Sequence, residues 1–302
     1  MLCCDLLHGH DHDGSGGSRR YLVIALAITL GVFFVELVGG YATNSLALSA
    51  DAWHMLNDAF ALGFAAVAAW IAERPNDFRK TFGYYRAEIL AAFCNGLFLF
   101  AIVVYIFISA VERLRFPSVV ASGEMLVIAV LGLGANGLSA FVLSRSESES
   151  LNVRGAFLHV VSDTLGSVGV IVAGVVMLFT GWYQADPVFS MVVGVLIFAG
   201  AFRLVRESVN VLLEGVPAGI DAGLVERRIL DRAGVVGVHD LHVWCMTPTR
   251  ICALTCHVVV HLDVDRRKLT EDLIKMLDAE FGIDHTTIQL EDEGYPKAER
   301  EH

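Results

Sequence analysis

Polar and apolar positions divide the chain into three parts. Residues up to about 20 are polar, and residues from about 21 to 213 are mainly apolar. After about residue 214, polar and apolar residues are mixed as in an ordinary soluble domain. A membrane-crossing helix needs about 20 mainly apolar residues. The central part contains six such runs, so we predict membrane helices at 21–42, 46–72, 85–112, 122–144, 154–180 and 186–209.

The distribution of basic residues predicts the orientation of these helices. Six crossings place both chain ends on one side of the membrane, and cytoplasmic loops are the ones that collect Lys and Arg. The side with the chain ends carries Arg19, Arg20, Arg74, Arg79, Lys80, Arg86, Arg145, Arg154, Arg203 and Arg206, and the other side carries only Arg113 and Arg115. We therefore expect both termini in the cytoplasm.

The last part of the chain has the pattern of a small α/β domain. Helical spacing at 221–232 and 266–281 alternates with strand-like runs at 238–244, 251–262 and 286–290. The order αββαβ predicts helices packed on one face of a three-stranded sheet. We thus expect a tail at 1–20, a six-helix transmembrane domain at 21–213 and a cytoplasmic αββαβ domain at 214–302.

Composition supports a protein that lies in a lipid bilayer. Hydrophobic residues make up 55% of the chain and charged residues only 18%, whereas soluble proteins carry about 25% charged residues. The net charge of -11 argues against nucleic-acid binding. The six cysteines contain no Cys-x-x-Cys pair, so we expect reduced thiols in a cytoplasmic compartment.

Two His-x-x-x-Asp pairs lie inside apolar runs, His54 with Asp58 and His159 with Asp163. Residues four apart share one face of a helix, and ionisable groups within a membrane mark ion or substrate paths. Together the pairs would offer two nitrogens and two oxygens, a tetrahedral set suited to Zn²⁺. Their two negative charges would balance the charge of the ion, as a low-dielectric site requires.

Other interpretations of these pairs stay open at this point. One pair alone could pack or face a water-filled vestibule. A membrane-embedded zinc hydrolase would need an open coordination position, and the His-Glu-x-x-His string of helical zinc hydrolases is absent. A non-transporting metal-sensing platform is the other alternative. The acidic residues Glu36 and Asp51 also lie within spans, where Glu36 could belong to a proton path and Asp51 could support the ligands or relay from the cytoplasm to the site.

Four segments carry a resemblance to a known family: 44–58 (NSLALSADAWHMLND), 81–90 (TFGYYRAEIL), 152–163 (NVRGAFLHVVSD) and 238–244 (VHDLHVW). The chain resembles the cation diffusion facilitator family, and in particular its bacterial zinc, cobalt and cadmium exporters. The resemblance implies a homodimer in the bacterial inner membrane, a metallochaperone-like cytoplasmic domain and metal export against inward proton flow. It implies a transporter and no enzymatic activity.

The family's transport ligands correspond here to His54, Asp58, His159 and Asp163. Imidazole at the first position favours Zn²⁺, with Co²⁺ or Cd²⁺ also accepted. Because bound imidazoles must be neutral, protonation would expel the metal.

The cytoplasmic domain resembles the family in a second set of ligands. His239, His257 and Glu291 match regulatory zinc ligands, and His261 and His285 are further candidates. Surface histidines without a function are the alternative for each of them. His242 should face the other side of the strand from His239 and be structural.

Two other segments bear on metal binding. The loop at 72–81 contains no His or Cys, so we expect it to lack the loop metal site that some family members carry. The tail residues His8, His10 and His12 form a short chelating tract that would capture metal weakly.

Overall fold

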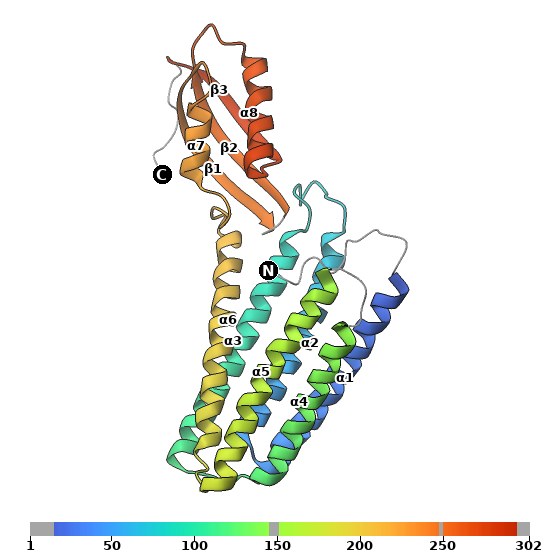
Figure 1. Cartoon of the computed structure of the whole chain (residues 1–302). Coiled ribbons are helices and arrows are strands. Elements are labelled where there is room, and N and C mark those ends of the chain that lie inside the picture. The colour runs from blue at the N-terminus through green and yellow to red at the C-terminus, as the bar shows by residue number, and fades with distance from the viewer. Residues whose placement is uncertain (1–14, 145–150, 248–249, 295–302) are drawn as a thin grey trace. The chain divides into compact units, whose positions relative to one another are not determined.

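The chain forms six long helices followed by a small α/β domain in a computed structural model (Figure 1). The structure describes residues 15–144, 151–247 and 250–294, with side chains except at 15–23, 25–26, 62, 143–144, 151–162, 165 and 250. The long helices are α1 (Ser15–Thr43), α2 (Leu46–Ala72), α3 (Arg86–Arg115), α4 (Ser122–Ser144), α5 (Leu151–Thr180) and α6 (Ala185–Leu212). All six predicted membrane helices are therefore present.

Within the described residues, four helices are long and apolar enough to cross a membrane: α2, α3, α6 and the Ser122–Val142 part of α4. The apolar parts of α1 and α5 that could be searched are shorter, at Ala27–Thr43 and Gly166–Thr180. Large apolar side chains point outward from the bundle, as lipid-facing residues do. They include Phe34, Val38, Val104, Ile108 and Leu196.

Helix α2 lies at the centre of the packing of the bundle. Its residue Ala50 packs with α3 and α6, Ala47 and Leu48 pack with α4 and α5, and Met55 packs with α1. The six helices run side by side (Figure 1). A polar side chain on α2 is therefore held in position by neighbours on several sides.

The second part contains α7 (Ala222–Leu230), β1 (Val235–Thr247), β2 (Arg250–Val260), α8 (Arg266–Phe281) and β3 (His285–Asp292). Asp221 caps α7, Asp265 caps α8, and Gly282 ends α8 in the left-handed conformation. The sheet has the order β1-β2-β3, with an antiparallel first pair and a parallel second pair. The predicted αββαβ order is confirmed.

Alternation along β2 separates the two faces of this sheet. Leu254, Cys256, Val258 and Val260 belong to the core that contains the buried residues of α7 and α8. Because successive strand residues point to opposite faces, Thr255, His257 and Val259 point to the face without helices.

A bulge in β1 changes the expected direction of His242. His239 pairs with His257, and His242 pairs with Thr255, so three residues of β1 span two of β2. Asp240 within the bulge has a φ of 51°. His242 therefore lies on the same face as His239 and is exposed, with Asp240 as its ion-pair partner at 2.8 Å. The expectation that it faces the opposite side was wrong.

The chain divides into two compact units, Met1–Trp70 with Ala91–Val205 and Ile71–Leu90 with Arg206–His302. The second unit contains the loop between α2 and α3 as well as the sheet. In that unit Arg86 pairs with Glu214 at 2.9 Å.

Candidate metal centres

Helices α2 and α5 bring three of the four predicted transport ligands together. One ligand atom each from His54, Asp58 and Asp163 lies within 4.8 Å of the others. His54 Nε2 is 3.8 Å from Asp58 Oδ2, as expected for residues one helical turn apart. Asp163 is only 3% exposed and His54 Nδ1 has no hydrogen-bond partner within the described residues. The arrangement offers a nitrogen and two carboxylates to one cation.

The fourth predicted ligand, His159, has a side chain outside the described residues. Its backbone belongs to α5, one turn before Asp163. Its part in the site remains a prediction.

Asp51, two turns before Asp58 on α2, connects the two helices that carry the ligands. The Ser167 hydroxyl lies 3.2 Å from Asp51 Oδ2 and 3.3 Å from the Asp163 carbonyl oxygen. Gly166 leaves room for Asp51, because a Cβ at that position would lie 2.9 Å from Asp51 Oδ1. Ser167 and Gly166 were not singled out in the sequence, since small residues in an apolar helix give no signal of their own.

A second group lies on the helix-free face of the sheet. His239, His257 and Glu291 each offer one ligand atom within 4.8 Å of the others. Register explains the convergence: His239 pairs with His257, His257 pairs with Gln289, and Glu291 follows Gln289 by two residues on the same face of β3. The sequence alone cannot show this register.

Glu291 sits between the two imidazoles. Its Oε2 is 3.1 Å from His239 Nε2 and its Oε1 is 2.7 Å from His257 Nδ1. Burial favours the neutral acid, but hydrogen bonds from His257 and His239 outweigh burial and hold the pKa of Glu291 below its usual value. The carboxylate is therefore ionised at neutral pH. Two nitrogens and a charged oxygen form a donor set suited to Zn²⁺.

Gln289 supports this group and was missed in the sequence. Its Nε2 donates to Glu291 Oε1 at 2.8 Å. Alternation in β3 could have placed it beside Glu291, but nothing in the sequence singles it out.

The remaining predicted ligands lie outside both groups. His261 follows the end of β2 and pairs with Glu293 at 2.8 Å, with both side chains more than half exposed. His285 packs edge-on against Phe82 of the α2–α3 loop, with ring centroids 5.6 Å apart. The tail residues His8, His10 and His12 lie outside the described residues.

The α2–α3 loop uses its own carboxylate to hold its shape. Asp77 Oδ1 accepts hydrogen bonds from the backbone N–H groups of Arg79 and Lys80, both at 2.7 Å, and Tyr84 donates to Oδ2 at 3.2 Å. Backbone hydrogen bonds from Lys80 and Arg79 lower the pKa of Asp77. The absence of a metal site in this loop remains a prediction.

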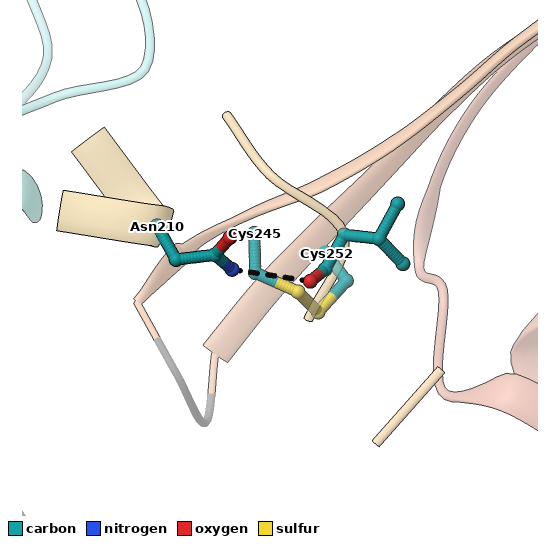
Figure 2. The surroundings of a disulfide bond; sticks show 4 residues. Asn210, Cys245 and Cys252 are labelled. Carbon is teal, nitrogen blue, oxygen red and sulfur yellow. Dashed lines mark hydrogen bonds between the residues drawn. A yellow bond between two sulfur atoms is a disulfide. The ribbon is translucent and has the colours of Figure 1, made fainter. Parts of the chain in front are cut away.

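Cys245 and Cys252 are joined by a disulfide bond near Asn210 (Figure 2). They are direct partners in the β1–β2 ladder, with Cα atoms 4.0 Å apart. The expectation of reduced thiols was therefore wrong for this pair, because strand register and not sequence spacing brings them together. Cys94 and Cys256 are free, and burial raises the pKa of the Cys256 thiol to about 12.

Two protein-family models match the chain. The cation efflux transmembrane domain matches residues 22–213, and the cytoplasmic domain of the cation efflux protein matches residues 217–293. Their division corresponds to the change from the helical bundle to the α/β domain.

Bacterial relatives align over nearly the whole chain. The metal cation efflux system protein CzcD of Cupriavidus metallidurans is 47% identical over 94% of this chain and 90% of its own length. The zinc transporter ZitB of Escherichia coli is 42% identical over 95% of this chain and 93% of its own. The cadmium, cobalt and zinc/H(+)-K(+) antiporter of Bacillus subtilis is 40% identical, again over 95% and 93%. The chain belongs to the cation diffusion facilitator family and is a multi-pass membrane transporter of cations with a cytoplasmic C-terminal domain, not an enzyme.

Proposed function

We propose that the protein exports Zn²⁺ from the cytoplasm in exchange for protons, and that it also accepts Co²⁺ and Cd²⁺. The observation that carries the proposal is the convergence of His54, Asp58 and Asp163 inside an apolar bundle. A carboxylate in such surroundings is costly unless a cation or a proton balances it. The names of the relatives, which include zinc transporters and a cadmium, cobalt and zinc antiporter, support the same substrates.

Competition between metal and proton at the ligands would provide the coupling. With His159 as the fourth ligand, two neutral imidazoles and two carboxylates would hold one divalent ion with no net charge. An imidazole that takes up a proton loses its lone pair for the metal. Proton uptake by a ligand and release of the metal would therefore be coupled, so that an inward proton gradient can drive zinc export.

The cytoplasmic group supports a regulatory role for bound zinc. We propose that His239, His257 and Glu291 bind Zn²⁺ and that the protein works as a homodimer whose acidic cytoplasmic domains approach when metal offsets their repulsion. Residues 1–20 would be a cytoplasmic tail, 21–213 the transport domain and 214–302 the dimerising domain. Both termini would lie in the cytoplasm of a bacterium, with the bundle in its inner membrane.

Flux of Zn²⁺ into proteoliposomes under an imposed pH gradient tests the transport proposal. The wild type should accumulate zinc, and Asp163→Ala should reduce accumulation to the level of empty vesicles, because one of the charged ligands is lost. Glu124→Ala, which removes an exposed carboxylate from the first turn of α4, is the matched control and should transport normally.

Two outcomes would contradict the transport proposal. Near-normal flux of the Asp163→Ala variant would mean that this group is not the transport site. Zinc binding without flux in the wild type would favour the metal-sensing platform.

A further inference from the structure

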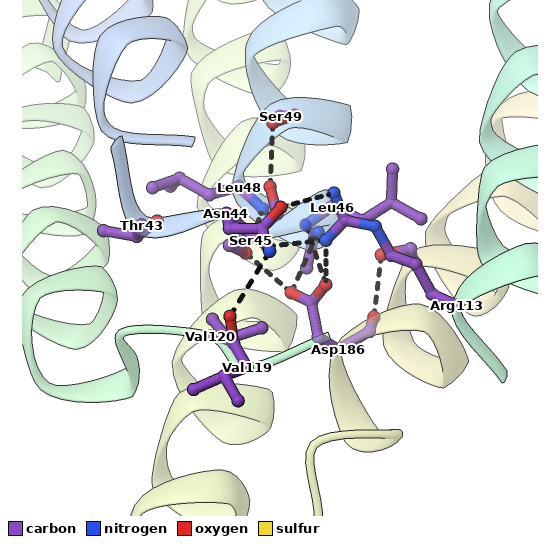
Figure 3. A network of polar contacts seen from close by, with 12 residues as sticks. Thr43, Asn44, Ser45, Leu46, Leu48, Ser49, Arg113, Val119, Val120 and Asp186 are labelled. Atoms are coloured by element: carbon purple, nitrogen blue, oxygen red, sulfur yellow. Dashed lines mark hydrogen bonds and ion pairs between the residues drawn. The ribbon is translucent and has the colours of Figure 1, made fainter. Parts of the chain in front are cut away.

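The first turn of the ligand-bearing helix α2 is held by a residue from another helix. Asp186, in the first turn of α6, is fully buried. Its carboxylate accepts hydrogen bonds from the Ser45 hydroxyl at 2.6 Å and from the backbone N–H groups of Leu46 and Ala47 at 2.7 and 3.1 Å (Figure 3). The first N–H groups of a helix have no partner within it, and a negative charge there is favourable. Asp186 therefore caps α2 across about 140 residues of sequence.

A third helix joins the same network. Arg113, in the last turn of α3, lies 3.5 Å from Asp186 Oδ2. It also donates to the Asn44 carbonyl oxygen at 2.5 Å and to Asn44 Oδ1 at 3.1 Å. Asn44 has a φ of 57°, as the tight turn between α1 and α2 requires. Three hydrogen bonds and one cation satisfy the buried carboxylate. Removing its charge would therefore weaken the contacts that join the α1–α2 turn, the start of α2 and the end of α3.

This network lies far from the cytoplasmic end of the bundle. Helix α6 leads at Leu212 into the cytoplasmic domain, so Asp186 marks its opposite end. Hereafter the network of Asn44, Ser45, Arg113 and Asp186 is called the far-end clamp.

The two halves of α2 differ in what surrounds them. Next to the clamp, Leu46, Ala47, Leu48 and Ala50 are all at most 2% exposed. Beyond the ligands, α2 is buried along one face only: Ala68 is 3% exposed, whereas Phe60, Phe64 and Val67 are 45, 40 and 57% exposed, as lipid-facing residues are. A helix that is fixed at one end and borders lipid along one face at the other can move by tilting about its fixed end.

We propose that Asp186 is a positioning residue for transport. The far-end clamp is then the pivot about which α2 tilts when the metal site closes to one side of the membrane and opens to the other. This rests on the proposed transport function. His54 and Asp58 follow Leu46 by eight and twelve residues, or about 12 and 18 Å along the helix at 1.5 Å per residue. A tilt of about 10° would then move them by about 2 and 3 Å, enough to break a metal–ligand bond of about 2 Å.

The experiment compares Asp186→Asn with the wild type in the full-length protein. Three quantities are measured: zinc flux in proteoliposomes, zinc affinity without a gradient, and hydrogen exchange of the Leu46 and Ala47 amides. Asp186→Asn should lower kcat for flux at least tenfold, leave zinc affinity within threefold, and speed amide exchange at least tenfold. Arg113→Gln, which leaves the bonds from Asp186 to α2, should lower kcat at least threefold. Glu124→Gln, on the exposed first turn of α4, should match the wild type.

The outcomes separate a pivot from a merely structural contact. Faster exchange with unchanged kcat would overturn the proposal, because the clamp would then be irrelevant to transport. A loss of kcat with a proportional loss of zinc affinity would also overturn it, because the site itself would have collapsed. Absence of flux in the wild type would instead refute the proposed function and leave the clamp's effect on exchange intact.

Discussion

Glu291→Gln should weaken zinc binding in the cytoplasmic domain by about 30-fold. The substitution keeps the shape of the side chain and removes its negative charge. The metal-free protein should keep its fold, because an amide can still hydrogen-bond to both imidazoles at the observed distances of 3.1 and 2.7 Å and only the contribution of the charge is lost. The effect should therefore appear in metal affinity and not in the fold.

The magnitude follows from the charge and from the exposure of the site. A divalent ion about 2.7 Å from the centre of a carboxylate gains about 3 kcal/mol even at the dielectric constant of water. The dielectric constant of water gives the smallest value of this energy. It is the appropriate choice because His239 and His257 are 23 and 24% exposed, although Glu291 is only 5% exposed. The amide oxygen that remains recovers about 1 kcal/mol as a neutral ligand. The difference of about 2 kcal/mol corresponds to about 30-fold.

The assay is competition between the purified full-length protein and a fluorescent zinc chelator. It is carried out in the Asp163→Ala background, so that the transport site does not contribute. Glu293→Gln is the matched control, since it removes an exposed neighbouring carboxylate that pairs with His261 and lies outside the group. It should change affinity by less than twofold.

Equal affinities of the Glu291→Gln variant and its background would refute the reasoning. In that case either zinc does not bind between these strands or the carboxylate does not contact it. An equally large loss in the Glu293→Gln control would point instead to a diffuse effect of negative charge.

Three further predictions concern selectivity, pH and thiol chemistry. His54→Asp should raise the ratio of Cd²⁺ to Zn²⁺ flux in a competition assay, because oxygen replaces a nitrogen ligand and adds charge; an unchanged ratio would place selectivity elsewhere. Because the pKa of Glu291 is lowered in the folded protein, its stabilisation of the metal-free sheet should be present above about pH 4.3 and disappear as the pH falls through the lower folded value. Protection of the β3 amides against hydrogen exchange, corrected for intrinsic rates, should fall over that range in the wild type and less in Glu291→Gln. Maleimide should leave the buried Cys256 unlabelled at pH 7 in the folded protein and should label Cys245 and Cys252 only after reduction; mass spectrometry of the peptides would detect the opposite result.

Local pattern in the sequence was enough to predict the elements and to place His54 and Asp58 side by side. Membrane helices are recognised by long apolar runs. Such a run forms a helix in lipid because every backbone polar group must find its hydrogen-bond partner within the segment. The pairing of His54 with Asp58 needs only the helical repeat, since residues four apart always share a face. The order of helices and strands in the cytoplasmic domain likewise follows from periodicity.

Contacts between distant segments depended on the tertiary structure. The three-residue group on the sheet requires the register of β1, β2 and β3, and a single bulge at Asp240 was enough to reverse the expected direction of His242. The disulfide between Cys245 and Cys252 has the same origin.

Asp186 shows the difference most clearly. In the sequence it is an ordinary acidic residue at the start of a helix, next to Pro187. Only packing buries it against the first turn of α2 and beside Arg113. Periodicity is a property of neighbouring residues, so the sequence determined which faces are polar. The partner of a buried charge is chosen by the packing of helices far apart in the chain, and that is what the tertiary structure decided.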